Sequence, residues 1–247
     1  PSLPHPLSNA TGCKVGNKIY LAGGMESLEL AASTKDFLVL DLEDKERRWK
    51  ELPPWPGPSR AYAVSCSQSD GYDNCFYLFS GRSLNGNSPW NVLSDAYYFN
   101  PRLGQWKSIS GNFNVMAGTA AAFGTNHILL MGGRNSDNAD ERKIWSYHTV
   151  TNTLCAIELP EGLSIPVTTN SFRNAKGETV ITCGEDSPGS RTPFLLKGTL
   201  QSTIHRLSFT DYSVIALYFL VLIFIGWYFS KKQKTSDDYF RGGGRIP

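Results

Sequence analysis

The chain has 247 residues, of which 40% are hydrophobic, 12% aromatic and 19% charged, and its formal net charge is +2 at pH 7. This composition is typical of a globular protein long enough for one large all-β domain or two smaller domains, and it excludes a disordered tail. Because the net charge is small and no basic run is interleaved with aromatic residues before residue 230, no nucleic-acid partner is predicted. The chain begins without Met and ends GGGRIP in mid-motif, so we expect it to be an internal piece of a longer protein.

A short apolar run that ends on small residues recurs four times along the chain: IYLAGG at 19–24, FYLFSG at 76–81, ILLMGG at 128–133 and VITCGE at 180–185. The last glycines of these runs, Gly24, Gly81, Gly133 and Gly184, are separated by steps of 57, 52 and 51 residues. A nearly constant period of about 50 residues indicates a repeat architecture in which each repeat is one structural unit.

Each run is followed, after a polar loop, by a second strand-like run: FLVLDL, AYYFNP, IWSYHT and PFLLKG. Trp49 and Trp106 follow in the first two units, where an outer strand would start, and Leu154 takes this place in the third. Strands of small residues, such as AYAVSC and GTAAAFG, precede the glycine runs. This order predicts four-stranded blades arranged radially, with the small-residue strands near the axis.

The glycine pair followed by a distant tryptophan resembles the kelch β-propeller family over residues 1–200. The resemblance implies an all-β fold with about four blades present of a probable six. The third unit departs from the pattern because it lacks the tryptophan. The fourth has no outer strand before the chain leaves at Gly198, and a closed ring would take that strand from an upstream segment.

The cysteines and histidines show no metal-binding spacing: five cysteines include no C-x-x-C pair, and four histidines are scattered singly. We therefore expect no metal site and no cofactor. Cys66 and Cys75 bracket a turn-rich loop between two strand-like runs. They could pair across a hairpin in an oxidising compartment or remain as two free thiols, and the sequence leaves both open.

The residue after each glycine pair begins a loop that opens on one face of a kelch ring: Met25, Arg82, Arg134 and Glu185. Loops between blades reach the same face in this family, which adds Arg60. Arginines match carboxylates through a bidentate fork, so Arg60, Arg82 and Arg134 are predicted to bind an anionic substrate. The alternative is that these arginines hydrogen-bond loop carbonyls and neighbouring acids.

The stretch GEDSPGSRT at 184–192 resembles a loop of the N-acetylneuraminate epimerases, also called cyclically permuted mutarotases, which are kelch propellers. Their pattern Gly-Glu-x-x-Pro-Gly-x-Arg-Thr is matched at each specified position by Gly184, Glu185, Pro188, Gly189, Arg191 and Thr192. The resemblance implies that Glu185 and Arg191 are catalytic residues, and a carboxylate can move the protons that interconversion of anomers requires. Without it, a turn with a surface ion pair worth about 0 to 1 kcal/mol is the simpler interpretation.

An uncharged apolar segment, YSVIALYFLVLIFIGWYFS at 212–230, is predicted to be a transmembrane helix. Nineteen residues at 1.5 Å rise span about 28 Å, close to the hydrocarbon thickness of a bilayer. Lysines and arginines are more frequent after the segment, at Lys231, Lys232, Lys234, Arg241 and Arg245, than before it, at Lys197 and Arg206. This asymmetry predicts a cytoplasmic C-terminal flank and a propeller in the periplasm or at the cell surface. The alternative is a buried core helix.

The last 37 residues resemble the opening segment of sodium:solute symporters, with Asp238, Tyr239, Phe240, Gly242, Gly243 and Pro247 matching its motif. We therefore expect three parts: a propeller at 1–200, a linker at 201–210 and a first transporter segment at 211–247. The sodium and substrate sites of that family belong to later helices, which this sequence lacks. KKQK could instead be a simple cytosolic stop signal.

Together the two resemblances imply an extracytoplasmic sialic acid mutarotase fused to a sodium-coupled solute transporter, with a small sugar acid, the membrane and a sodium ion as partners. One alternative is a non-catalytic propeller that binds sugar at the transporter mouth. Another is a kelch interaction protein anchored by a single span.

Overall fold

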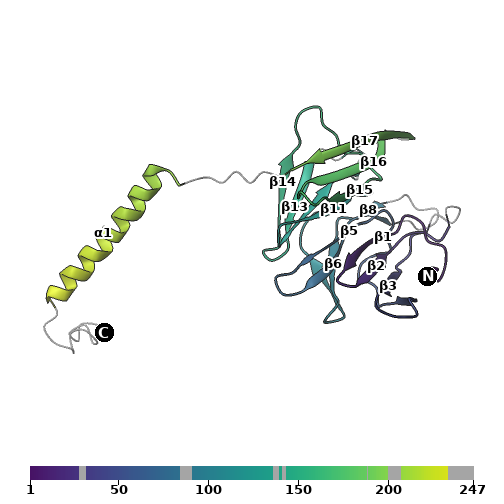
Figure 1. Ribbon diagram of the computed structural model, residues 1–247, viewed down its shortest axis with the longest axis horizontal. Coiled ribbons are helices and arrows are strands. Elements are labelled where there is room, and N and C mark those ends of the chain that lie inside the picture. The colour runs from purple at the N-terminus through teal and green to yellow at the C-terminus, as the bar shows by residue number, and fades with distance from the viewer. Residues whose placement is uncertain are drawn as a thin grey trace. The chain divides into compact units, whose positions relative to one another are not determined.

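The computed structural model describes residues 1–27, 32–83, 91–135, 139–140, 143–187, 189–199 and 207–232. The chain divides into two units, Pro1–Thr199 and Leu200–Pro247. The first unit consists of β-strands and the second contains a helix (Figure 1).

The first unit is a β-propeller of four blades, and each blade is an antiparallel sheet. Blade 1 contains β1 (Thr11–Val15), β2 (Lys18–Ala22), β3 (Phe37–Asp41) and β4 (Trp49–Glu51). Blade 2 contains β5 (Val64–Ser69), β6 (Asn74–Phe79), β9 (Ala96–Asn100) and β10 (Gln105–Ile109), with a two-stranded ribbon of β7 (Arg82–Ser83) and β8 (Asn91–Val92) inserted after β6.

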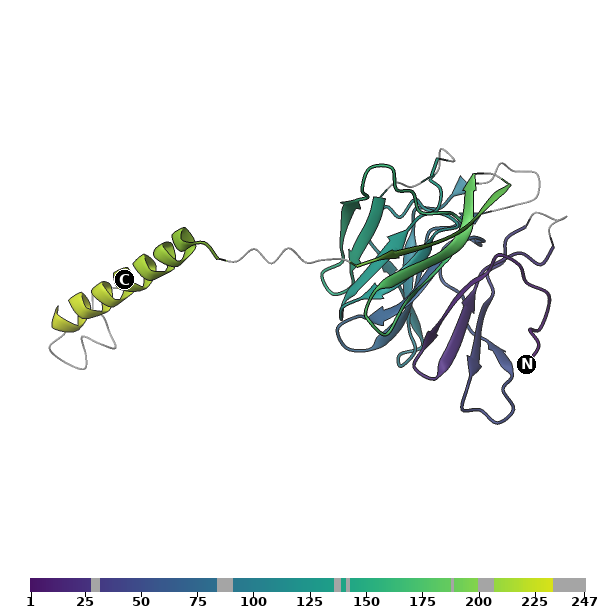
Figure 2. The same cartoon turned by 45° about the horizontal axis from the view of Figure 1, so that its top comes forward.

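Blades 3 and 4 repeat the pattern, the last with three strands in the described part of the chain. Blade 3 contains β11 (Thr119–Phe123), β12 (His127–Met131), β13 (Lys143–His148) and β14 (Thr153–Glu158). Blade 4 contains β15 (Asn170–Arg173), β16 (Thr179–Ser187) and β17 (Ser190–Gly198). Each predicted glycine run lies on the second strand of its blade, so the predicted all-β propeller with about four blades is confirmed (Figure 2).

The inner strands β1, β5, β11 and β15 contact one another in this order around the axis. The residues Asn9, Tyr62, Ala117 and Thr168 precede them, and all four have a positive φ, between 50° and 56°, which is uncommon for residues other than glycine. This conformation turns each backbone toward the previous blade. The N–H groups of Tyr62, Ala117 and Thr168 then donate to the carbonyls of Asn9, Tyr62 and Ala117 over 3.0, 2.8 and 2.7 Å.

The hydrophobic core lies between the blades. Tyr20, Phe37 and Phe76 are buried between blades 1 and 2, where the Trp106 ring packs at a tilt against Phe37 with 4.7 Å between ring centroids. A second cluster of buried residues, which includes Tyr77 and Tyr147, fills the space between blades 2 and 3. Such aromatic pairs contribute about 0.5–1.5 kcal/mol beyond the burial of their area, so they fix how neighbouring blades pack.

The suggested disulfide between Cys66 and Cys75 is not formed, and all five cysteines are free thiols. In the β5–β6 pair Cys66 lies opposite Tyr77, whereas Cys75 lies opposite Gln68. The two cysteines therefore occupy different register positions and are not cross-strand neighbours. Burial raises the pKa of each thiol to about 12, so neither is a reactive thiolate at neutral pH.

The second unit contains α1 (Phe209–Lys232). Ser208 caps its N-terminus: the Ser208 N–H donates to Asp211 Oδ2 over 2.7 Å, and the Asp211 N–H donates back to Ser208 Oγ over 3.4 Å. The stretch Phe209–Lys231 has a mean hydropathy of 2.1 and is long and apolar enough to cross a membrane. The predicted symporter motif from Asp238 to Pro247 lies outside the described residues, as do Arg206, Lys234, Arg241 and Arg245.

Candidate functional site

The four residues that follow the glycine pairs occupy equivalent positions in the fold. Each forms an isolated antiparallel bridge with the segment that leads into an inner strand: Ser8 with Met25, Ala61 with Arg82, Met116 with Arg134 and Val167 with Glu185. These bridges lie at the same end of every blade. The predicted equivalence of Met25, Arg82, Arg134 and Glu185 is therefore confirmed.

The glycine before each of these residues allows the close approach that the bridge requires. Gly184 has a φ of 125°, and a Cβ added there would lie 2.6 Å from the carbonyl oxygen of Val167. A side chain at this position would push the β16 strand away from the segment before β15. The glycine therefore sets where the Glu185 backbone lies.

Glu185 and Arg191 are register partners across the β16–β17 hairpin. The hairpin closes between Ser187 and Ser190, and the register shifts on either side of the pair, between Thr182 and Gly184 and between Glu185 and Ser187. Residues directly opposite each other in an antiparallel pair project from the same face with Cβ atoms about 4.5–5.5 Å apart. The register thus sets the backbones of Glu185 and Arg191 opposite each other, although six positions separate them in the sequence.

Both side chains keep their polar groups available. Within the described part of the chain neither Glu185 nor Arg191 forms a side-chain hydrogen bond or ion pair, and Arg191 is exposed. The surface ion pair considered from the sequence is therefore not formed between them. The guanidinium can donate to a ligand without first breaking a contact within the protein.

Arg191 lines a hollow of about 650 Å³ beside the hairpin. The other lining residues are mostly hydroxyl and amide side chains: Thr168, Thr169, Asn170, Thr182, Cys183, Gly184, Thr192 and Pro193. Hydroxyl and amide groups can both donate and accept hydrogen bonds, as sugar hydroxyls do. The hollow combines this lining with one positive charge, which fits an anionic sugar. Glu185 is not among the lining residues.

The structure argues against the predicted substrate-binding role of Arg60. This side chain is completely buried. Its Nη1 donates to the Ser80 carbonyl over 2.8 Å and its Nη2 to the two Asp95 carboxylate oxygens over 2.9 and 2.8 Å. With its terminal nitrogens occupied inside the protein, Arg60 cannot reach a ligand, so we assign it to the framework between blades 1 and 2.

Arg82 and Arg134 both lie at the bridge positions and are partly exposed. The Arg82 guanidinium lies over the Tyr62 ring, 4.4 Å from its centroid, next to the axis. Arg134 Nε is 3.2 Å from Asp140 Oδ1, and the Asp140 side chain is partly exposed. These two arginines keep surface through which they could contact a ligand, in contrast to Arg60.

Two groups of polar residues that the structure brings together were not predicted from the sequence. Asp95, the partner of Arg60, directly precedes β9, just as Asp36 directly precedes β3. Aligning the repeats on their third strands would have shown this recurring aspartate. His5, Glu26 and Asp36 come together near blade 1. Their spacing in the sequence matches no metal-binding motif, so the sequence contained no signal for this group.

The fold and the bridge positions define a kelch-type β-propeller. A family model described as N-acetylneuraminate epimerase matches residues 1–142, and the chain belongs to this family. Glu185 and Arg191 lie beyond the matched residues, so their roles rest on the hairpin and on its loop motif.

Comparisons with single proteins agree with this assignment. The chain is 26% identical over 136 residues to an N-acetylneuraminate epimerase of Haemophilus influenzae. This match covers 55% of the chain and 33% of the epimerase. It is 52% identical over 44 residues to the sodium/sialic acid symporter SiaT of Proteus mirabilis, covering 18% of this chain and 9% of the symporter. The chain thus spans about a third of the length of the epimerase relative.

A solved structure, described as the structure of YjhT, resembles the chain with a TM-score of 0.66 and 16% sequence identity. The match covers 83% of this chain and 68% of that one. At this identity the likeness shows the propeller fold. The combination of a propeller with a segment similar to a symporter confirms the two family resemblances expected from the sequence.

Proposed function

We propose that the propeller interconverts the anomers of an anionic sugar, with N-acetylneuraminate or a close relative as the substrate. The observation that carries this proposal is the register of the β16–β17 hairpin, which sets Glu185 opposite Arg191 beside a hollow lined by hydroxyl and amide groups. The names of the relatives support the choice of sugar.

The proposed reaction needs only proton transfers. Glu185 accepts the proton of the anomeric hydroxyl, the bond from the anomeric carbon to the ring oxygen breaks, and the protonated Glu185 gives its proton to the ring oxygen. The open keto form then recloses on its other face with the reverse transfers, so the enzyme returns to its starting state. Arg191 holds the carboxylate of the sugar through its bidentate fork, and Arg82 and Arg134 are further candidates for contacts with the anion.

Replacing Arg191 by Lys should weaken sugar binding and leave slow turnover of a neutral analogue nearly unchanged, because lysine keeps the charge and loses the fork. The matched control is Arg173→Lys, an exposed arginine of the same blade whose Nη2 donates to the Gly177 carbonyl. Exchange between anomers, measured by NMR at several sugar concentrations, separates affinity from rate. Equal affinities for Arg191→Lys and the parent would remove Arg191 from the site.

A second candidate function is sugar binding without catalysis. It is favoured by one observation, that Arg191 lines the hollow whereas Glu185 does not. In that case the chain binds the sugar and the anomers exchange at the rate found in buffer. The same NMR experiment decides, because it reports binding and exchange separately.

We further propose that α1 is the first span of a sodium-coupled transporter and that the propeller lies outside the cytoplasm. The similarity to SiaT and the apolar length of α1 support this arrangement. The propeller would then convert the released anomer into the form that the transporter imports.

Cysteine labelling tests the orientation. Cys155 and Cys183 are exposed thiols of the propeller, and a maleimide that does not cross the cytoplasmic membrane should label them in intact cells. The matched control removes both thiols as Cys155→Ser and Cys183→Ser and adds Ser236→Cys, which should react only after the cells are opened. The opposite labelling pattern would place the propeller in the cytoplasm.

A further inference from the structure

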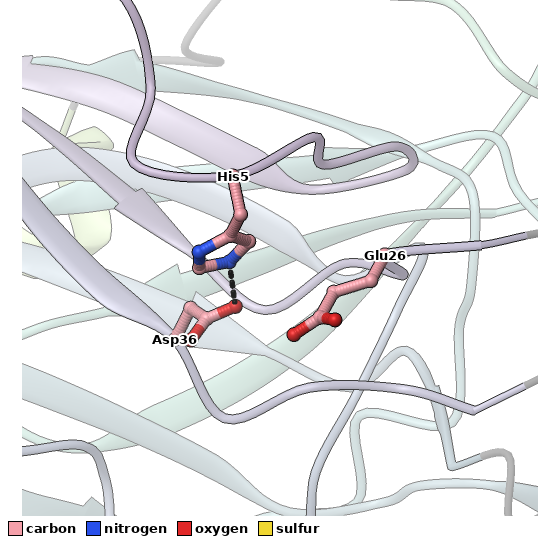
Figure 3. A group of neighbouring side chains, drawn as sticks. All are labelled: His5, Glu26 and Asp36. Carbon is pink, nitrogen blue, oxygen red and sulfur yellow. Dashed lines mark hydrogen bonds and ion pairs between the residues drawn. The ribbon is translucent and has the colours of Figure 1, made fainter.

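Three side chains that can ligate a metal meet in blade 1, and none of them belongs to the β16–β17 hairpin. His5, Glu26 and Asp36 each offer one ligand atom, and these atoms all lie within 4.8 Å of one another. His5 Nε2 is 3.0 Å from Asp36 Oδ2, and the Glu26 carboxylate points toward this pair (Figure 3). The three residues come from separate segments: the stretch before β1, the loop after β2 and the residue before β3.

Backbone hydrogen bonds hold these three segments together. Ser8 and Met25 exchange two bonds of 2.8 Å, which join the segment that carries His5 to the residue before Glu26. The Gly23 N–H donates to the Asp36 carbonyl over 2.8 Å, and the Thr34 N–H donates to the Gly24 carbonyl over 2.9 Å. The cluster is therefore set by the blade itself and does not depend on a chance meeting of long side chains.

The aspartate at the same position in blade 2 has a cationic partner, which Asp36 in blade 1 does not share. The Ser80 N–H donates to the Asp95 carbonyl over 3.0 Å, as the Gly23 N–H does to Asp36, so the two aspartates are equivalent. The Asp95 carboxylate is balanced by the buried guanidinium of Arg60. In blade 1 the equivalent aspartate faces an imidazole and a second carboxylate instead. Among these three side chains two carboxylates face one imidazole, so at least one negative charge is not balanced within the cluster itself.

From this contrast we propose that His5, Glu26 and Asp36 bind a divalent transition-metal cation of the Zn²⁺ type. One imidazole nitrogen and two carboxylate oxygens are a donor set suited to such ions. Ligand atoms about 2.1 Å from a tetrahedral zinc are about 3.4 Å apart, so the His5–Asp36 separation needs only a small adjustment. Glu26 is exposed and can close the remaining distance.

The bound ion would take the place that the Arg60 guanidinium occupies in blade 2. It would tie the segment before β1 to blade 1, and a fourth coordination position would stay open to water or to another ligand. The sequence-based expectation of no metal site came from local spacing, whereas this cluster depends on the topology of the blade. The inference is independent of the proposed sugar chemistry, because it uses none of the hairpin residues.

The test uses the whole chain in detergent, freed of any affinity tag and stripped of metal by a chelator. Co²⁺ is the probe, because its visible spectrum reports nitrogen and oxygen ligands and a sulfur-to-metal band would reveal binding at a cysteine. We expect one Co²⁺ per chain, no sulfur band, and displacement by Zn²⁺.

Glu26→Gln is the first variant, because the exposed side chain can be changed without disturbing the fold. Loss of an outer-shell partner typically costs 10- to 100-fold in metal affinity, so loss of a direct ligand should weaken Co²⁺ binding by at least about 100-fold. His5→Gln should do the same.

The matched control is His148→Gln, which changes a histidine of β13 whose ring contacts the His127 ring edge to face. It should leave Co²⁺ affinity unchanged. The inference is overturned if the parent binds no Co²⁺, if Glu26→Gln and His5→Gln bind as tightly as the parent, or if the bound ion shows a sulfur band. It is equally overturned if His148→Gln alone abolishes binding.

Discussion

Replacing Glu185 by Gln should lower the rate of anomer exchange by about 10²- to 10⁴-fold while leaving sugar binding nearly unchanged, since this is the usual contribution of a positioned general acid or base. The amide has the size of the carboxylate and cannot take up a proton at neutral pH. Glu185 is held opposite Arg191 by the hairpin register, and Gln keeps that backbone geometry. The loss should therefore appear in the rate and not in the affinity.

The control for this variant is Asp186→Asn, which removes the adjacent carboxylate at the register shift of β16. Asp186 is exposed, so we expect exchange at the parental rate. NMR exchange between anomers at several sugar concentrations gives both quantities for each variant. Exchange at the parental rate in Glu185→Gln, or an equal loss in Asp186→Asn, would contradict the role assigned to Glu185.

Replacing Arg60 by Met should destabilise the propeller by about 3 kcal/mol, because Arg60 is completely buried and its loss leaves the half-buried Asp95 carboxylate and the Ser80 carbonyl without their donor. Arg60 links two blades: its N–H donates to the Thr34 carbonyl, its own carbonyl accepts from Gly24, and its guanidinium holds Asp95. Asp95 Oδ2 also accepts the Tyr97 hydroxyl over 2.8 Å, and burial together with this bond raises the pKa of Tyr97 to about 12. A carboxylate left without Arg60 would thus sit among apolar and hydroxyl groups.

Arg102→Met is the matched control, because Arg102 forms an ion pair of 2.9 Å with Asp73 and its own side chain is 66% exposed. Exposed pairs contribute about 0–1 kcal/mol, so this change should have little effect. Unfolding by urea, followed through tryptophan fluorescence, compares the two, since Trp55 is buried beside Arg60. Asp95→Asn gives a milder test if Arg60→Met does not fold. Equal losses for Arg60→Met and Arg102→Met would contradict the framework role.

The blade architecture could be predicted because each blade is formed by one continuous stretch of sequence with a recurring pattern of strands. Each glycine run begins on the second strand of a blade, and the small-residue strands are the inner strands, which contact one another around the axis. The equivalence of Arg82, Arg134 and Glu185 followed from the same spacing. The hairpin pairing of Glu185 with Arg191 was also predictable, since it depends on a tight turn within one short segment.

The predictions that failed depended on contacts between segments far apart in the chain. Arg60 was expected at the mouth, but its partner Asp95 lies 35 positions away and becomes its neighbour only when blades 1 and 2 pack together. His5 and Asp36 were missed for the same reason, because 31 positions separate them.

The central claim is that this propeller catalyses the exchange of sugar anomers, and the most direct test is the parent chain itself. Purified protein in detergent is mixed with freshly dissolved N-acetylneuraminate, and the approach of the two anomers to equilibrium is followed by NMR. We predict a rate that rises in proportion to protein concentration and returns to that of buffer in Glu185→Gln. A rate equal to that of buffer at every concentration of the folded parent protein would contradict the account.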